Sequence, residues 1–360
     1  MFVAEKIPHK RIEGWRYGNP QALAQVGACS HPLSLLVDDS LKTHEIIFEN
    51  TLVRIGSALI NSVSLEISPV MSTAKYGHLL KEQDIPTLSI VCSEDMSLVW
   101  GWRTDPCTNL SLQCHIIVKP GIAASISTGA PSDQLSIWMH RECHVGAGAT
   151  LSWIEASTTP FSNRLGTANI TLERAAKFVD LDLSVGGKFV HDERHVYMNE
   201  DSRANLFAGH LLEDNHHRDL HFCVRHLAAG ALSSQDVRAV VGDQSVSGFD
   251  GLIHVAEGAR ATQAFQQAKI LLLNDGATHH GKPELEIFHD DVICSHGVAI
   301  GNIDDEALFY LTSRGIPEKR ARDMLLRAFI YGLVEAAAVE LGGLTPDDAV
   351  VDRMLGDGGA

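Results

Sequence analysis

Short runs of apolar residues, interrupted by polar turn residues, dominate the middle of the chain. Stretches such as Cys114–Val118 and Phe178–Leu183 are rich in β-branched and apolar residues, and Gly, Asp, Asn or Ser separate such runs. Runs of this length bounded by turn residues are typical of β-strands. No helix of ordinary length is indicated between residue 46 and about residue 304. We therefore expect a mainly β region there.

The strand region repeats along the sequence. Small residues recur at intervals of 26 to 28 residues, at Ala123, Ala149, Ala176, Ala204, Ala231 and Ala259. A period of this length predicts a solenoid, in which each coil buries its inner face against the next. Small residues at one corner let parallel backbones stack about 4.8 Å apart. We predict a right-handed parallel β-helix. A β-sandwich is the alternative, but its more closely spaced hairpin signals are weaker here.

The chain divides by pattern into three regions. Residues 1–45 are expected to be partly helical, with Asn19 as a candidate N-cap. Residues 46–303 are expected to form the β-helix, whose repeats are clearest over residues 115–300. Residues 304–360 are expected to form a C-terminal helical domain.

The C-terminal region contains two predicted helices. Asp304 is a candidate N-cap for Asp305–Arg314, and Gly315 supplies a left-handed stop. Pro317 begins a longer helix that reaches about Leu341. Five of its residues are spaced to form one apolar face: Ala321, Met324, Leu325, Ala328 and Phe329. We expect this face either to cover the open end of the solenoid or to dock a partner.

Charge and cysteine content argue against several classes of protein. Lys and Arg number 29 against 45 Asp and Glu, and the resulting net charge of -16 repels phosphate backbones and anionic lipids. We therefore expect no nucleic acid or membrane partner. The first 17 residues lack the apolar core of a signal peptide, which predicts a cytoplasmic location. The seven cysteines have no C-x-x-C spacing, which disfavours a disulfide framework or a four-thiolate metal site.

Two features imitate functional sites. Gly276–Lys282 has the spacing of a phosphate-binding loop, but Pro283 stands where that loop needs Ser or Thr, and a strand pattern follows. We expect a plain turn between coils there. The adjacent histidine pairs, His216-His217 and His279-His280, are expected to be solvated loop residues, because neighbouring residues of a strand face opposite ways and rarely chelate one ion.

Cys294 and His296 are the candidate chemical site. On a strand they share one face at i and i+2, and Gly297 lets the backbone approach another surface closely. Thiolate and imidazole are good ligands for iron, zinc or copper. Two ligands make an incomplete metal site, so either a second chain supplies the others or the pair is a buried cysteine beside a hydrogen-bonded histidine.

Several segments resemble the SufB/SufD family of iron-sulfur cluster assembly proteins, and its SufD branch more than its SufB branch. The densest matches are Lys282–Ile287, Asp290–Gly297, Phe309–Ile316 and Ala328–Phe329, in family order, and Glu13–Tyr17 resembles the family's N-terminal signature. The resemblance implies a non-catalytic scaffold subunit. Such a subunit has a β-helix core with helical ends and pairs with a SufB homologue through that core.

The resemblance also implies partners and site residues. His296, with Cys294 nearby, would lie at the SufB-facing interface and share a transient iron-sulfur cluster with the partner. The C-terminal helices would bind a SufC homologue, which would carry the ATP. The candidate contacts there are Tyr310, Arg314, Gly315 and Phe329. Reduced flavin is a further cofactor of such complexes, for which no residue can be named, and the chain alone would form a homodimer through the same edge.

Two other functions stay open from the residues. A β-helical enzyme that acts on polysaccharides would use paired carboxylates such as Glu284 and Glu286, although only 6% of the chain is aromatic and sugar sites usually contain aromatic platforms. A self-sufficient metalloprotein would use Cys294, His296 and further histidines. Stoichiometric metal in the purified chain alone would distinguish this last function from a scaffold.

Overall fold

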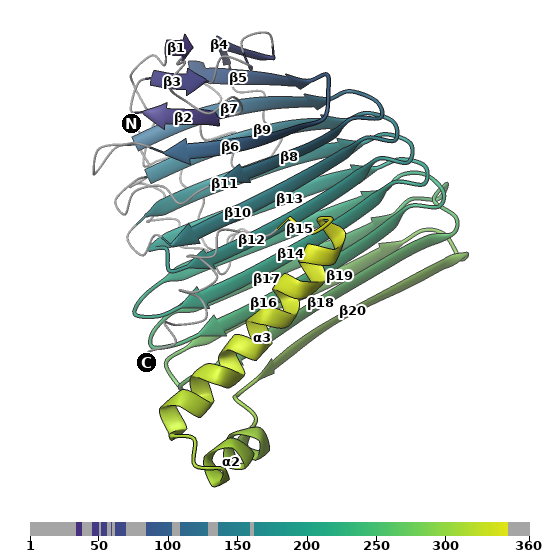
Figure 1. Cartoon of the computed structure of the whole chain (residues 1–360). Coiled ribbons are helices and arrows are strands. Elements are labelled where there is room, and N and C mark those ends of the chain that lie inside the picture. The colour runs from purple at the N-terminus through teal and green to yellow at the C-terminus, as the bar shows by residue number, and fades with distance from the viewer. Residues whose placement is uncertain are drawn as a thin grey trace, which may run out of the picture.

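Two long parallel sheets and two C-terminal helices make up the structure, a computed structural model (Figure 1). It describes residues 34–37, 45–49, 52–55, 59, 62–69, 84–102, 109–128, 136–158 and 162–344. The predicted N-terminal helix after Asn19 and the signature Glu13–Tyr17 lie outside these residues, as do Cys29 and Cys107.

From residue 84 onward, successive strands alternate between the two sheets. Sheet A contains β1 (Ser34–Val37), β2 (Glu45–Glu49), β3 (Leu52–Ile55), β6 (Met96–Trp102), β8 (Ala123–Thr128), β10 (Thr150–Thr158), β12 (Lys177–Val185), β14 (Arg203–Leu212), β16 (Leu232–Val241), β18 (Thr262–Leu272) and β20 (Val292–Gly301). Sheet B contains β4 (Val63–Pro69), β5 (Asp84–Cys92), β7 (Asn109–Val118), β9 (Ser136–Val145), β11 (Asn163–Leu172), β13 (Phe189–Met198), β15 (His217–His226), β17 (Val246–Val255) and β19 (Thr278–Ile287).

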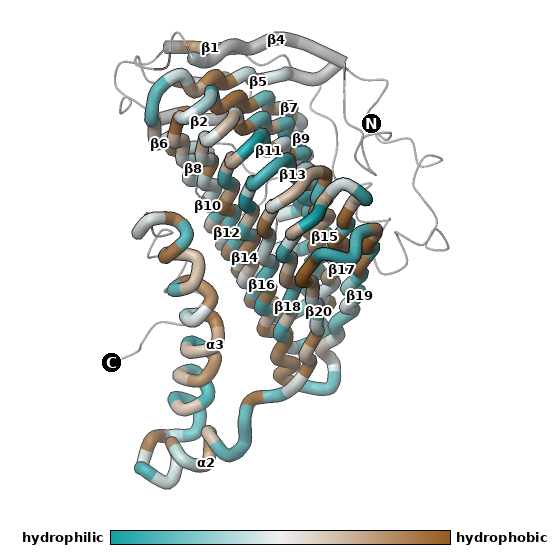
Figure 2. The backbone as a smooth tube through the Cα atoms, turned by 90° about the vertical axis from the view of Figure 1, so that its right-hand side faces the viewer, coloured by the Kyte–Doolittle hydropathy of each residue, from teal (hydrophilic) through white to brown (hydrophobic). Residues whose placement is uncertain are grey.

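The strand pairs form a parallel β-solenoid. Each coil contributes one strand to each sheet, and the coils from β7–β8 to β19–β20 number seven. Every pairing between these coils is parallel, for example β10 with β12 and β11 with β13. Figure 2 shows the two sheets edge-on, with apolar residues recurring along both. The predicted mainly β fold is therefore confirmed.

One corner of each coil repeats the same backbone conformation. A residue with positive φ stands there in six successive coils, at Gly121, Gly148, Ala175, Asp201, Gly230 and Ala261. Each of these residues donates its backbone N–H to a carbonyl of the next coil; Gly148, for example, bonds the carbonyl oxygen of Arg174 at 2.9 Å. Coils are thus joined at the corner as well as along the strands.

The predicted alanine repeat is correct in only half of its members. Ala149, Ala176 and Ala231 directly follow a left-handed corner residue and are buried. The corner position itself recurs at intervals of 26 to 31 residues, because the turns of the later coils are longer. A search for a nearly constant interval therefore selects Ala204 and Ala259, which lie two and three residues away from the true positions Ser202 and Thr262.

Salt-bridged charges lie inside the middle coils. Strand alternation directs four arginines and four carboxylates inward between the sheets: Arg141, Arg164, Arg194, Arg218, Glu155, Asp180, Asp182 and Asp192. Arg218 Nη2 lies 2.6 Å from Asp182 Oδ2 and 3.0 Å from Asp192 Oδ2, and Arg194 Nε lies 3.1 Å from Asp180 Oδ2. The equal number of opposite charges allows burial, because each ion has a partner.

The C-terminal helices begin where the sequence predicts. In α2 (Asp305–Ser313), Asp304 Oδ1 accepts hydrogen bonds from the backbone N–H of Glu306 at 2.9 Å and of Ala307 at 3.2 Å. Gly315 follows with φ +87°, as expected of a left-handed stop. The longer helix α3 (Glu318–Glu340) follows Pro317.

Helix α3 lies across the outer face of sheet A, over β12, β14 and β16, and neither helix that the structure describes covers the terminal coil (Figures 1 and 2). The expectation that it covers the open end is therefore wrong. The predicted apolar face is also partly wrong, because Met324 and Ala328 are exposed. The residues that pack on sheet A lie mostly later in the helix: Ile330, Leu333, Val334, Ala337 and, just beyond it, Leu341. Lys177 of β12 fixes the far end through an ion pair with Glu340 at 3.0 Å.

Candidate functional site

Cys294 and His296 lie on β20, the last strand of sheet A. The register pairs Cys294 with Ala264 and His296 with Gln266 on β18. Ala264 and Gln266 are buried, so both site residues project from the inward face of the strand at the open end of the solenoid. Cys294 packs partly against the apolar cluster around Ile253, whereas His296 is exposed.

The thiol of Cys294 is in a mainly apolar environment. Burial raises its pKa, and a hydrogen bond with the backbone of Ala264 acts in the opposite direction. A free thiol with a raised pKa stays protonated at neutral pH, and a bound metal ion is what would remove the proton. In the part of the chain that the structure describes, no three His, Cys, Asp or Glu side chains are grouped so that they could hold a metal ion. Cys294 and His296 thus offer two donors and need others.

A glutamine pair lies directly below His296, and the sequence did not single it out. Gln266 Nε2 donates a hydrogen bond to Gln235 Oε1 at 2.8 Å, and the buried Gln266 Oε1 has no hydrogen-bond partner among the described residues. Gly251 makes room for this amide, since a Cβ at that position would lie 1.8 Å from Gln266 Nε2. A buried amide oxygen therefore lies on β18, the strand next to the one that contains the imidazole.

The outer edges of β19 and β20 are open. Within the described ranges, no strand pairs with either edge. Large apolar side chains are exposed beside them, including Ile293 (60%), Phe288 (58%) and Ile300 (51%). Unpaired edges with exposed apolar residues mark a surface that can add strands of another chain.

Three of the four residues expected to contact a second partner lie together at the end of α2. Tyr310 is exposed, and the guanidinium of Arg314 lies 4.6 Å from the centre of its ring. Gly315 follows directly, and Phe309, which is 72% exposed, extends this surface. Phe329 lies apart from these residues, on α3, and is partly buried. The guanidinium carbon of Arg238 lies 5.7 Å from the centre of its ring.

The segment that imitates a phosphate-binding loop is a turn followed by a strand. Thr278 begins β19, so residues up to Ile287 are extended where a phosphate site would need a helix N-terminus. The expectation of solvated loop histidines is wrong for His217, His279 and His280, which lie on strands. Along the described residues, neither helix has the length and apolar character that a membrane crossing requires.

Comparisons with known proteins agree over the solenoid. Residues 104–329 match the family model described as "SUF system FeS cluster assembly, SufBD core domain". The chain is 33% identical over 195 residues to the iron-sulfur cluster assembly protein SufD of Escherichia coli (strain K12), which covers 54% of this chain and 46% of that protein. It is 33% identical over 165 residues to Protein ABCI7, chloroplastic, of Arabidopsis thaliana, covering 45% and 35%. The matches thus span less than half of each relative's length.

Proposed function

Because the chain belongs to the SufB/SufD family of iron-sulfur cluster assembly proteins, we propose that it is a non-catalytic scaffold subunit that pairs with a SufB homologue. The observation that carries this proposal is the terminal coil, whose outer edges have no strand partner among the described residues and whose strand β20 contains Cys294 and His296. A SufB homologue that extends both sheets would place its own side chains next to these two.

The nascent iron-sulfur cluster would be bound at this interface. Imidazole nitrogen and thiolate sulfur both bind iron, and two donors from this chain hold it only weakly until the partner adds more. Binding is therefore coupled to pairing of the subunits. The amide oxygen of Gln266 lies on the coil below and is available to accept the second ring N–H of His296.

A SufC homologue would bind at the exposed end of α2, formed by Phe309, Tyr310 and Arg314. ATP would be bound and hydrolysed on that partner, since Lys282 lies within β19 here and not at a helix N-terminus. No residue is assigned to flavin, and the cytoplasmic location stays a prediction. In the absence of a SufB homologue, the same open edge would form a homodimer.

The other functions considered have less support. Glu284 Oε2 lies 3.1 Å from Lys282 Nζ, and Glu286 Oε2 lies 3.0 Å from His254 Nδ1, so each carboxylate expected at a polysaccharide site is paired with a basic side chain. A self-sufficient metal site around Cys294 would need a third ligand of this chain, and the described residues provide none in reach.

The decisive experiment compares His296→Ala with the wild type in the complex. We expect co-expression with SufB-like and SufC-like proteins, followed by anaerobic purification, to give a complex that contains iron and sulfide. The substitution should remove most of the iron and leave the subunit ratio unchanged, because His296 is exposed and supports no packing.

His144→Ala is the matched control, since this histidine is half exposed on sheet B, far along the stack from β20. It should leave iron, sulfide and subunit ratio unchanged. Iron that stays at the wild-type level in His296→Ala, or a failure of the three proteins to associate, would contradict the proposed function.

A further inference from the structure

A chain of histidines and carboxylates lies on the outer face of sheet B. Val196 of β13 and Leu220 of β15 belong to the apolar core, so the odd-numbered residues of both strands project outward. Five of these outward residues form a network: His191, Glu193 and His195 on β13, and His217 and Asp219 on β15. The two strands are neighbours in the middle of sheet B, and none of the five residues belongs to the proposed cluster interface (Figure 2).

His191 lies between two carboxylates. Its Nε2 is 3.2 Å from Glu193 Oε1 on the same strand, and its Nδ1 is 3.8 Å from Asp219 Oδ2 on the next coil. Each carboxylate also contacts a second imidazole. Glu193 Oε2 lies 3.3 Å from His195 Nε2. Asp219 Oδ2 lies 3.0 Å from His217 Nε2, so imidazoles and carboxylates alternate along a continuous chain that joins β13 to β15.

The centre of this network is buried and its geometry requires a charged ring. His191 and Glu193 are each 2% exposed, and Asp219 is 4% exposed. Both ring nitrogens of His191 face a carboxylate oxygen, whereas a neutral imidazole has only one N–H to donate. The doubly protonated ring is therefore the form that satisfies both carboxylates, and a buried carboxylate left without a cation is costly.

The protonation equilibria agree with this geometry. Burial by itself lowers the pKa of His191, but hydrogen bonds with Asp219 and Glu193 outweigh it and raise that pKa above its usual value. Burial acts in the same direction on His195, whose hydrogen-bonding partners, Glu193 among them, raise its pKa to about 9. The two carboxyl groups show the reciprocal effect. Burial alone would raise the pKa of each, and hydrogen bonds with the histidines hold it well below its usual range.

Other groups on the neighbouring strands complete the surroundings of His191. The ring of His221 on β15 lies beside it, with ring centres 4.8 Å apart, and His221 Nδ1 is 3.4 Å from Asp250 Oδ2 on β17. Asp250 thus has its own imidazole partner. On β11 the register partners of His191 and Glu193 are the uncharged Leu165 and Thr167. The other outward-facing titratable residues of β13, β15 and β17 are Tyr197, Cys223, Arg225 and His254.

We propose that this network is a pH-sensitive clamp between the coils of β13 and β15, closed while His191 is charged and loosened when its ring loses a proton. Deprotonation leaves a nitrogen lone pair facing a carboxylate oxygen, which replaces attraction between the strands with repulsion. A histidine whose pKa is raised by folding stabilises the folded state fully below its unfolded pKa of about 6.5, and this contribution is lost as the pH rises through the folded value. The clamp therefore loosens on the alkaline side of neutrality.

The test compares the melting temperature of the purified full-length chain with that of His191→Gln between pH 6 and pH 10. Glutamine keeps one donor and one acceptor but carries no charge. The variant should melt at least about 2 °C below the wild type at pH 6.5, and the difference should shrink toward zero at pH 10, where the clamp is lost in both proteins. A difference that stays constant or grows with pH would overturn the proposal.

His144→Gln is the matched control. His144 is half exposed on β9, and its Nε2 lies 3.8 Å from a single carboxylate oxygen, that of Glu173. Its replacement should shift the melting temperature by less than about 1 °C at every pH. A pH profile equal to that of His191→Gln would show that the buried network has no special role.

Nitrogen NMR of the histidine rings tests the wild type directly and does not depend on folding of a variant. An ordinary histidine is neutral at pH 8. At this pH we expect at least two rings to remain in the imidazolium form, those of His191 and His195, and absence of any imidazolium signal would refute the clamp. Hydrogen exchange locates it: between pH 7 and pH 9.5, after correction for the intrinsic rate, protection should fall more in β13 and β15 than in β12 and β14. An equal loss in all four strands would contradict a clamp on sheet B.

Discussion

The ion pairs inside the solenoid show how single side chains control its stability. Arg218 and Asp182 are both 1% exposed, and Arg218 also contacts Asp192. Replacement of Arg218 leaves Asp182 and Asp192 buried with one cation fewer beside them, and breaking a buried ion pair typically costs about 3–5 kcal/mol. We therefore expect Arg218→Met, which keeps most of the side-chain volume, to lower the free energy of unfolding by about this amount in urea titrations.

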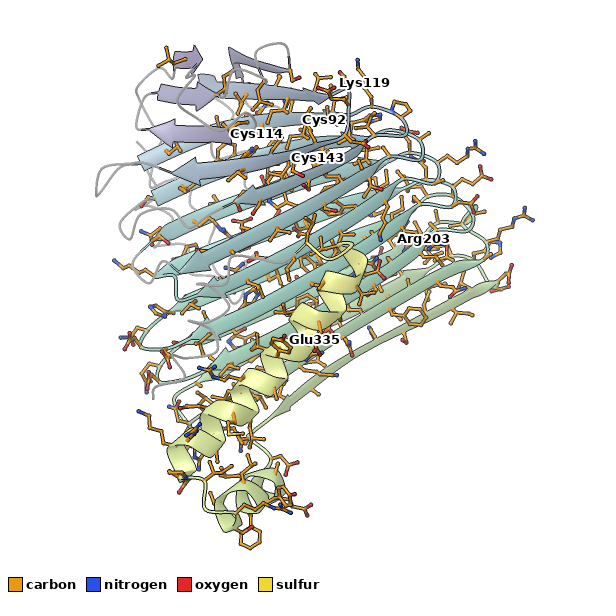
Figure 3. All side chains as sticks on the ribbon, in the orientation of Figure 1. Cys92, Cys114, Lys119, Cys143, Arg203 and Glu335 are labelled. Atoms are coloured by element: carbon orange, nitrogen blue, oxygen red, sulfur yellow. The ribbon has the colours of Figure 1, made fainter. Side chains whose placement is uncertain are left out.

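Arg203→Met is the control for this prediction. Arg203 lies exposed at a coil corner (Figure 3), and its replacement should change the free energy of unfolding by less than about 0.5 kcal/mol. Equal stability of Arg218→Met and the wild type would show that the network has no net stabilising role.

At the scale of elements, α3 is attached to a solenoid that has its own core. Leu333 is fully buried between the helix and sheet A. Leu333→Ala should remove about 2–5 kcal/mol from this contact. We expect hydrogen–deuterium exchange to increase in α3 and to stay slow in β12, β14 and β16, since these strands keep their backbone pairing and inner core.

Val339→Ala should leave exchange unchanged, because Val339 is 79% exposed on the same helix. An equal rise of exchange in the helix and the three strands would mean that the helix and solenoid form one cooperative unit.

Features that depend only on neighbouring residues, such as helix caps, are predicted correctly from the sequence. Features that depend on strand register or on helix packing are not. Asp304 and Gly315 act within one helical turn, so the cap and the stop of α2 are visible in the sequence. The side of α3 that packs on sheet A depends on which strands the helix contacts. The order of apolar and polar residues within the helix does not determine those strands. Gln266 and His296 lie on different strands, and only the exact lengths of the segments between β18 and β20 bring the two together.

At the scale of the whole molecule, the strands β19 and β20 have outer edges that no other described strand pairs with. Ile293 is 60% exposed on β20. A lysine on an edge strand opposes the addition of further strands. We therefore expect Ile293→Lys to weaken both the proposed homodimer and the proposed complex with a SufB homologue, measured by analytical ultracentrifugation.

Val339→Lys, a similar change on the outer side of α3, should leave the mass in solution unchanged. Identical sedimentation of Ile293→Lys and the wild type would show that the open edge is not the contact surface. The fold class and the extended conformation of Cys294 and His296 follow from the sequence, whereas the position of α3 on sheet A required the structure.

The attachment of α3 also has a consequence for the order in which the molecule is completed. Lys177 Nζ contacts the carbonyl oxygen of Glu340, 163 residues later in the chain, at 3.0 Å. On the ribosome, all the coils from β12 to β20 emerge before the helix does. The solenoid thus grows coil by coil through neighbour contacts, and a helix synthesised after these coils returns to join strands already in place. A nascent chain that stops before Glu318 would carry every strand that the structure describes and still lack the contact of α3 that spans β12, β14 and β16.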